Sequence, residues 1–197
     1  AFEPVLETAA ALGARNACVN GDEPDAPVLA DLLHRLCELG RSYGIRMHLE
    51  PTPWTGIPTI AAALHVLELC GHPEARLLVD TLHADRSRAT PADLAAVPRR
   101  LVDYVQVCDA SGPRPADVET MIWQARNERG FPGEGALDLV GMLCALPDAV
   151  PLSLEAPVRS LAATLTPVER AQRGRRAMAA LVVAVESRRR ATAPAAG

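Results

Sequence analysis

Residues 45–50 read Ile-Arg-Met-His-Leu-Glu, an alternation of apolar and polar side chains that is typical of an extended strand. In such a strand Arg46, His48 and Glu50 lie on one face and the apolar residues lie on the other. Parallel strands that are covered by helices on both sides are expected to be apolar on both faces. A strand with one polar face therefore predicts a barrel whose interior holds polar groups.

Short strand patterns alternate with helical patterns along the rest of the chain. Further strands are expected at residues 16–20, 76–80, 104–109 and 151–155. Helical patterns occupy residues 28–43, 57–70, 137–146 and 166–190, and residues 2–12 also read as a helix. This alternation predicts an α/β fold with parallel strands, and we expect one domain over residues 1–190 with a disordered tail over 191–197.

Composition narrows the possible partners. The net charge is −4 at pH 7, which provides no general attraction to nucleic acid. No apolar run is long enough to span a membrane, and the five cysteines form no C-x-x-C motif, as in a reduced cytoplasmic protein. The chain has no lysine, which excludes Schiff-base chemistry. The first residue is not Met, so we expect a chain that is cut at its N-terminus.

Four oxygen-bearing side chains are expected at the carboxyl ends of successive strands: Glu50, Asp80, Gln106 and Glu155. In a barrel these ends form the catalytic mouth, so the four side chains should converge. Three carboxylates repel one another unless a cation lies between them. The pattern therefore predicts a divalent metal site with these four residues as ligands.

Several short motifs accompany this set. They are L-E-P at 49–51, D-T-L-H at 80–83, Q-V-C-D at 106–109, R-G-F-P-G-E-G at 129–135 and S-L-E at 153–155. In combination they resemble the xylose isomerase-like TIM barrel superfamily, which includes sugar phosphate isomerases and epimerases and the inosose and 3-dehydroshikimate dehydratases. The resemblance implies a (β/α)8 TIM barrel of which strands four to eight are present.

The resemblance also implies an enzyme of carbohydrate metabolism. The main interpretation is an isomerase or epimerase of a sugar or sugar phosphate, in which a carboxylate transfers a proton and a metal stabilises an enediolate. The first alternative is a lyase, a dehydratase of a cyclic polyol ketone such as 3-dehydroshikimate or inosose. The second is an inactive or binding-only barrel fragment. No nucleic acid or membrane partner is expected, and assembly into a homo-oligomer stays open.

One residue departs from the superfamily pattern. Most members have a histidine where this chain has Gln106, and an amide oxygen favours Mg or Mn over Co or Zn, which stay possible. The dehydroshikimate dehydratase branch is similar in having Gln at this position, followed by Asp109-Ala110 and an F-P-G loop. This similarity is the reason for the lyase alternative.

Roles for individual side chains follow from their places in these motifs. Glu50 and Glu155 are expected to transfer protons from opposite sides of the barrel, with His83 at the same mouth as a third catalytic group. Candidates for substrate binding are Arg129, Arg126, Trp54 and His48. His48 lies one layer below Glu50, so it is either a pocket wall or a buried structural histidine.

Overall fold

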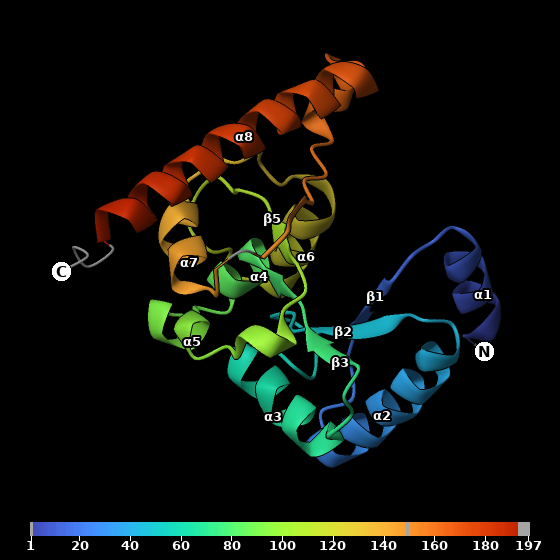
Figure 1. Ribbon diagram of the computed structural model, residues 1–197. Coiled ribbons are helices and arrows are strands. Elements are labelled where there is room, and N and C mark those ends of the chain that lie inside the picture. The colour runs from blue at the N-terminus through green and yellow to red at the C-terminus, as the bar shows by residue number, and fades with distance from the viewer. Residues whose placement is uncertain (1, 149, 193–197) are drawn as a thin grey trace.

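The computed structural model describes residues 2–148 and 150–192 (Figure 1). Its strands form an arc in chain order, and every paired neighbour runs parallel. The strands are β1 (Asn16–Asn20), β2 (Arg46–Glu50), β3 (Ala75–Leu77), β4 (Val79–Asp80), β5 (Val105–Val107) and β6 (Leu152–Leu154). This is part of the expected parallel α/β barrel.

The expected strand 76–80 is divided at Leu78. Before this residue, β3 pairs with β2, and after it, β4 pairs with β5. The backbone N–H of Leu78 still donates to the carbonyl of Leu49, at 3.0 Å, so the change of partner occurs within one continuous segment. The two three-stranded sheets are therefore joined through this segment into one curved surface.

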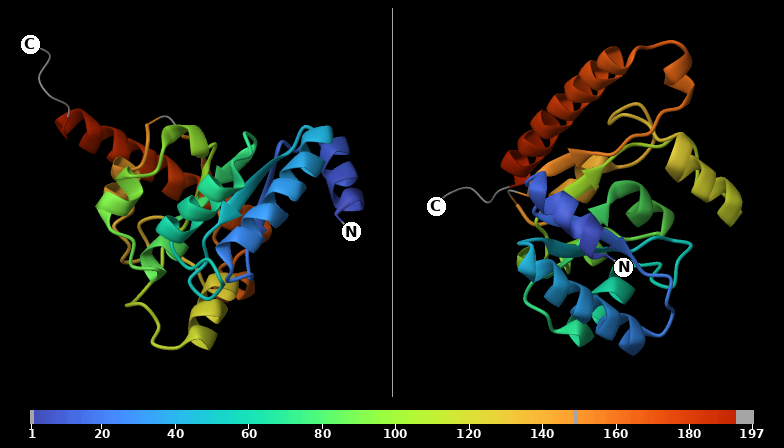
Figure 2. Two further views of the ribbon diagram at one scale, coloured as in Figure 1. Left: turned by 90° about the horizontal axis from the view of Figure 1, so that it is seen from below. Right: turned by 90° about the vertical axis from the view of Figure 1, so that its right-hand side faces the viewer.

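Helices lie outside this arc (Figures 1 and 2). They are α1 (Glu3–Ala11), α2 (Ala26–Ser42), α3 (Ile60–Cys70), α4 (Thr81–Arg86), α5 (Pro91–Ala95), α6 (Val118–Asn127), α7 (Leu139–Ala145) and α8 (Pro167–Thr192), with 3-10 turns at Arg99–Leu101 and Ser160–Ala163. Helices α2 and α3 pack beside β2 and β3, and α7 packs against α8 at the other end of the arc. Helix α8 extends two residues into the segment expected to be a tail, and residues 193–197 of that segment lie outside the described residues.

The alternation read from residues 45–50 accounts for the core. Ile45, Met47 and Leu49 are each 1% exposed and join one apolar cluster with residues of α2 and α3. Glu50 and His48, on the other face of β2, are buried polar residues. No helix in the described part of the chain combines the length and apolar character needed to cross a membrane.

Helix ends follow local sequence signals. Thr59 begins α3, where its hydroxyl accepts a hydrogen bond from the backbone N–H of Ala62 at 3.1 Å. Gly71 ends the helix with φ 59°, a left-handed conformation that glycine adopts without steric cost.

Strand β5 is shorter than the expected 104–109 because Asp109 leaves it and forms an antiparallel bridge with Gly130.

Candidate metal and active site

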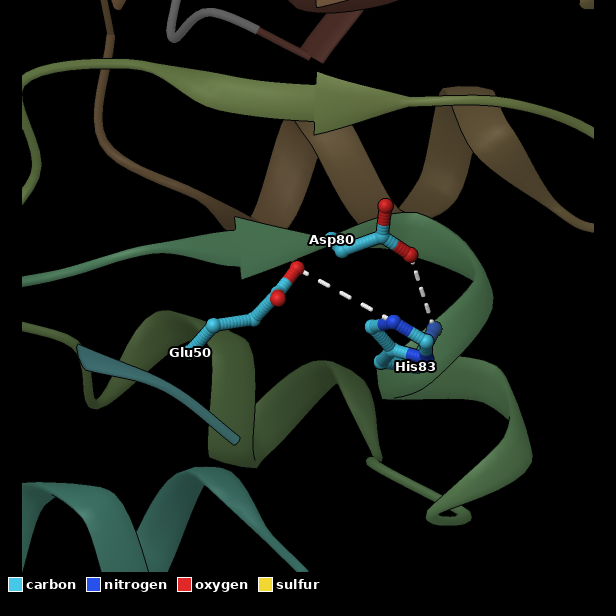
Figure 3. Close-up of side chains that lie close together, drawn as sticks. All are labelled: Glu50, Asp80 and His83. Carbon is cyan, nitrogen blue, oxygen red and sulfur yellow. Dashed lines mark hydrogen bonds and ion pairs between the residues drawn. The ribbon is translucent and has the colours of Figure 1, made fainter. Parts of the chain in front are cut away.

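Three side chains meet at the carboxyl ends of β2 and β4. Glu50 is the last residue of β2, Asp80 is the last residue of β4, and His83 lies in the first turn of α4. One potential ligand atom from each residue lies within 4.8 Å of the other two (Figure 3). All three residues are buried. This is the one such group of His, Cys, Asp and Glu ligands among residues 2–148 and 150–192.

The spacing between Asp80 and His83 has a local cause. Asp80 is the N-cap of α4, and its Oδ1 accepts a hydrogen bond from the backbone N–H of His83 at 2.9 Å. Capping fixes the first helical turn, so the His83 ring returns toward the strand ends. Its Nε2 lies 3.9 Å from Glu50 Oε1, and its buried Nδ1 has no hydrogen-bond partner within the described chain.

Strand β1 contributes two hydrogen-bonding residues that the sequence analysis did not identify. Asn20 donates from Nδ2 to Glu50 Oε2 at 2.8 Å and to the Thr52 hydroxyl at 3.0 Å. The Cys18 thiol donates to the same Glu50 oxygen at 3.4 Å. Alternation along residues 16–20 places Asn20 and Cys18 on one face of β1, and this was the signal available in the sequence. These donors hold Oε2, while Oε1 lies toward His83.

Gln106 lies beside Asp80 in the barrel wall. The two residues are register partners between β4 and β5, and Ser153 is the partner of Gln106 on β6. The amide oxygen of Gln106 is buried and has no hydrogen-bond partner among the described residues. An unsatisfied buried carbonyl is unfavourable, so this oxygen requires a donor or a cation that the described residues do not supply.

Arg129 lies between two of the expected metal ligands. Its Nη1 donates to Asp80 Oδ2 at 2.7 Å and is 3.0 Å from Glu155 Oε2. Its Nε donates to the carbonyl of Ala125 at 2.7 Å, which fixes the guanidinium in place. Glu155 follows the end of β6, so its carboxylate approaches Asp80 from the far side of Gln106.

Burial and like charges control the protonation of the site. Burial, followed by the charge of Asp80, raises the pKa of Glu50 to about 7. Burial also raises the pKa of Glu155, although Arg129 opposes the effect. Burial lowers the pKa of His83, which favours the neutral imidazole. Burial alone would lower the pKa of Arg129, but the charge of Asp80 raises it, so the guanidinium stays protonated.

These donors fit a divalent cation. The carboxylates of Glu50 and Asp80 converge, and Gln106, the register partner of Asp80 on the neighbouring strand, has a buried oxygen without a partner. Glu155 is the fourth member of the expected set, and its Oε2 lies 3.0 Å from Arg129 Nη1, the atom that also binds Asp80. A ring nitrogen of His83 lies within 4.8 Å of ligand atoms of Glu50 and Asp80, and the sequence analysis had assigned this residue a catalytic role.

The four candidate substrate-binding residues occupy different surroundings. Trp54 contacts the His83 ring edge-on at 5.1 Å between ring centroids, and Arg129 bridges the two carboxylates. His48 is fully buried, with Nε2 3.2 Å from Asp103 Oδ2, which matches the structural reading of this histidine. Arg126 is exposed on α6, and no contact joins it to the described site residues.

Asp109 organises the loop that carries Arg129. Its Oδ2 accepts from the backbone N–H of Gly133 at 3.0 Å, and its Oδ1 accepts from that of Leu137 at 3.1 Å. Gly130 completes the attachment through two backbone hydrogen bonds with Asp109. The motif at 129–135 is therefore fastened to the end of β5, next to Gln106.

Two curated relatives are similar to part of the chain, and both are named 3-dehydroshikimate dehydratase. The protein from Pseudomonas putida is 28% identical over 135 residues, which cover 66% of this chain and 21% of the relative. The protein from Pseudomonas aeruginosa is 30% identical over 132 residues, which cover 65% of this chain and 20% of the relative. The matched region thus spans about a fifth of the length of these relatives.

The fold is also similar to that of solved structures. One of them, the IOLI protein with a bound zinc atom, superposes with a TM-score of 0.79 at 18% sequence identity, covering 92% of this chain and 67% of the other. The family model described as xylose isomerase-like TIM barrel matches residues 1–181, which is nearly the whole chain. The chain therefore belongs to the xylose isomerase-like TIM barrel family.

Proposed function

We propose that this chain carries the metal-dependent active site of a dehydratase that acts on a cyclic polyol ketone of the 3-dehydroshikimate type. The observation that carries this proposal is the neutral, buried His83 beside two carboxylates and the unsatisfied Gln106 oxygen. The two curated relatives named 3-dehydroshikimate dehydratase support the choice of substrate.

The chemistry requires a base and an electrophile. Loss of water from a β-hydroxy ketone begins when a proton is removed from the carbon next to the carbonyl. Glu50, Asp80, Gln106 and Glu155 would hold a divalent cation, which would supply positive charge next to the substrate oxygen on which negative charge develops. We assign the base to His83, because its pKa is lowered by burial and its Nδ1 is not used by the fold.

The other residues position these groups. Asn20 and Cys18 hold one oxygen of Glu50, and the cap at Asp80 holds the turn that contains His83. Trp54 lies against the His83 ring and restricts the access of water from that side. Arg129 stays protonated and holds Asp80 and Glu155 through Nη1. A substrate carboxylate would share this guanidinium with them, since its planar fork of N–H donors suits such a group.

The test is an ultraviolet assay with 3-dehydroshikimate and Mg or Mn in the full protein. Dehydration generates a conjugated aromatic acid, so absorbance is expected to rise with time and to stop when a chelator is added. A His83→Gln variant should lose more than about 99% of the rate, the range typical of general base catalysis, while retaining bound metal. A rate that survives this substitution would exclude His83 as the base.

The second candidate is an epimerase or isomerase of a ketose. The placement of Glu50 and Glu155 on either side of Asp80, both with raised pKa values, favours it. One carboxylate would take a proton and the other would return it to the opposite face of the same carbon, or to the next carbon. A ketose panel assayed by chromatography, together with solvent deuterium incorporation, separates this reaction from dehydration.

Glu155→Gln distinguishes the two candidates. In an epimerase it should abolish turnover with little change in fold, because Glu155 would carry a proton in every cycle. In a dehydratase that uses His83, the same variant should weaken metal binding, measured by calorimetry, and the remaining rate should recover at high metal concentration. A variant that retains full activity at low metal concentration would contradict both roles.

A further inference from the structure

Helix α8 packs closely against two segments that lead into the metal site, the loop at 129–135 and the end of β6. The contact is made at Gly174, which is buried within the helix. A Cβ atom at this position would lie 2.5 Å from Leu154 Cδ2 and 3.2 Å from Phe131 Cε1. A side chain here would therefore displace one or both neighbours, so the missing Cβ sets how closely α8 approaches them.

Each of the two segments carries a charged residue of the site. Phe131 follows Arg129 by two residues in the loop. Leu154 is the last residue of β6 and directly precedes Glu155. Between the segments, Arg129 Nη1 lies 3.0 Å from Glu155 Oε2. The helix thus packs beside both members of this ion pair, although it contributes neither of them.

Arg173, the neighbour of Gly174, attaches the loop to α8 a second time. Its Nε donates to Glu134 Oε1 at 2.6 Å, and its guanidinium carbon lies 5.9 Å from the centroid of the Phe131 ring. The side chains of Arg173 and Glu134 are 41% and 33% exposed, and ion pairs with this much exposure contribute little to global stability. The attachment therefore acts mainly on the position of the loop.

The two members of the ion pair are held to different degrees. Arg129 is 6% exposed, and its Nε donates to the carbonyl of Ala125 at 2.7 Å. The adjacent Gly130 also exchanges two backbone hydrogen bonds with Asp109. The side chain of Glu155, in contrast, is 43% exposed. A shift of the segments against α8 is therefore expected to move Glu155 more than Arg129.

From this packing we infer that Arg173 and Gly174 are positioning residues of the metal site. They hold the loop and the end of β6 against one helix, and thereby set the distance between Arg129 and the expected ligand Glu155. Both residues act through the segments that they contact. The inference rests on the proposed function, because it concerns a ligand of the proposed cation.

The first test measures the binding of Mn²⁺ to the full protein by calorimetry. Gly174→Ala adds the missing Cβ and should raise the dissociation constant by about tenfold, the lower end of the range for a lost outer-shell partner. Arg173→Met removes the ion pair at similar side-chain length and should raise it by about two- to fivefold. Arg176→Met removes an exposed arginine of the same helix and is the matched control, for which no change is expected. An unchanged constant in Gly174→Ala would overturn the inference.

A compensating substitution separates positioning from general damage. Leu154→Val removes the Cδ2 atom that the new Cβ would meet. The double variant Gly174→Ala/Leu154→Val should therefore bind Mn²⁺ more tightly than Gly174→Ala, with Leu154→Val alone as the reference. Purely additive effects of the two substitutions would count against contact at this point as the cause.

The second test does not depend on a metal. The backbone N–H of Arg129 donates to the carbonyl of Pro157 at 2.9 Å, a hydrogen bond that joins the loop to the segment after β6. In chelator, hydrogen exchange at this amide, followed by NMR, should accelerate by about tenfold in Gly174→Ala, while the amides of β2 keep their rates. Equal acceleration in both places would indicate a general loss of stability and would overturn the inference.

The two tests distinguish failure of the inference from failure of the proposed function. If the natural protein binds no Mn²⁺, the proposed metal site is wrong, and the exchange rate at Arg129 still decides whether α8 positions the loop. If Gly174→Ala does not fold, Arg173→Met is used for both measurements, because its ion pair lies at the surface.

Discussion

At the scale of the residue, the active site combines polar groups that have hydrogen-bond partners in the fold with polar groups that have none among the described residues. Asp80 accepts hydrogen bonds from the backbone of His83 and from Arg129, whereas the Gln106 oxygen and His83 Nδ1 have no partner among the described residues. Burial of a polar atom without a hydrogen-bond partner is unfavourable, so these two atoms are the ones expected to contact a cation or substrate.

The metal preference is predicted to depend on Gln106. Gln106→His replaces an amide oxygen with an imidazole nitrogen, which is a better ligand for Co and Zn than for Mg. Calorimetric titration should show tighter binding of Co or Zn and no gain for Mg. Ser153→Ala, at the neighbouring register position, is the control and should leave the preference as it is. An unchanged preference in Gln106→His would mean that this residue is no ligand.

Arg129 is predicted to stabilise the metal-free protein. Its guanidinium and Asp80 are 6% and 0% exposed, so Arg129→Leu leaves a buried carboxylate without its partner. The free energy of unfolding should fall by about 3 kcal/mol in chelator and recover partly when a divalent cation is added. Arg126→Leu, three residues earlier but exposed, should change it by less than about 0.5 kcal/mol. Urea unfolding measures both.

Sequence reasoning located three oxygen-bearing residues of the site because strand ends and alternation determine where they point. Glu50, Asp80 and Gln106 all follow from these two patterns. It could not foresee that Arg129 would lie between Asp80 and Glu155, since this depends on the path of a loop that Asp109 anchors. A role for Arg129 in substrate binding stays a prediction.

At the scale of the element, short capping signals were more informative than long apolar patterns. Thr59 defines the start of α3 at residue 60, whereas the apolar pattern suggested residue 57. The short helix α4 has no apolar repeat of its own and is specified by the Asp80 cap and by packing of Leu82. Strand β5 is shortened because Asp109 pairs with Gly130, a contact between segments far apart in the sequence.

Removal of the α3 cap gives a prediction at this scale. Thr59→Ala deletes the acceptor for the backbone N–H of Ala62 and should lower the free energy of unfolding by about 1 kcal/mol. Thr59→Ser keeps the hydroxyl and is the matched control. Because α3 carries none of the proposed ligands, activity per folded molecule should be equal in both variants. Loss of activity in the folded alanine variant would connect α3 to the site.

At the scale of the whole molecule, stability is predicted to fall on acidification through His48. Burial holds the pKa of this histidine below its ordinary value of 6.5 in the folded protein. Below pH 6.5 the unfolded chain therefore binds the proton more readily, so protonation favours unfolding and stability decreases as the pH decreases. Above pH 6.5 His48 is neutral in both the folded and the unfolded chain, so protonation of His48 no longer lowers the stability.

The measurement is a series of urea unfolding curves between pH 5 and 8 for the natural protein and for His48→Gln. The variant should show a weaker loss of stability on acidification. Above pH 6.5 the difference in the free energy of unfolding between the two proteins should no longer change with pH. The difference isolates His48, because Glu50 has a raised pKa and acts with the opposite sign in both proteins. Parallel curves throughout would show that His48 is not buried in the neutral form.

The double use of Asp80 has an evolutionary consequence. A descendant of this chain that lost catalysis would still be selected to keep this aspartate, because α4 begins on it and Arg129 would otherwise lose its buried counter-charge and keep only the half-exposed Glu155. The presence of the aspartate in a related protein is therefore weak evidence that the protein is an active enzyme. Gln106 is free to change once turnover is no longer needed, since no partner within residues 2–148 and 150–192 restrains its oxygen, and it is the better marker of retained activity.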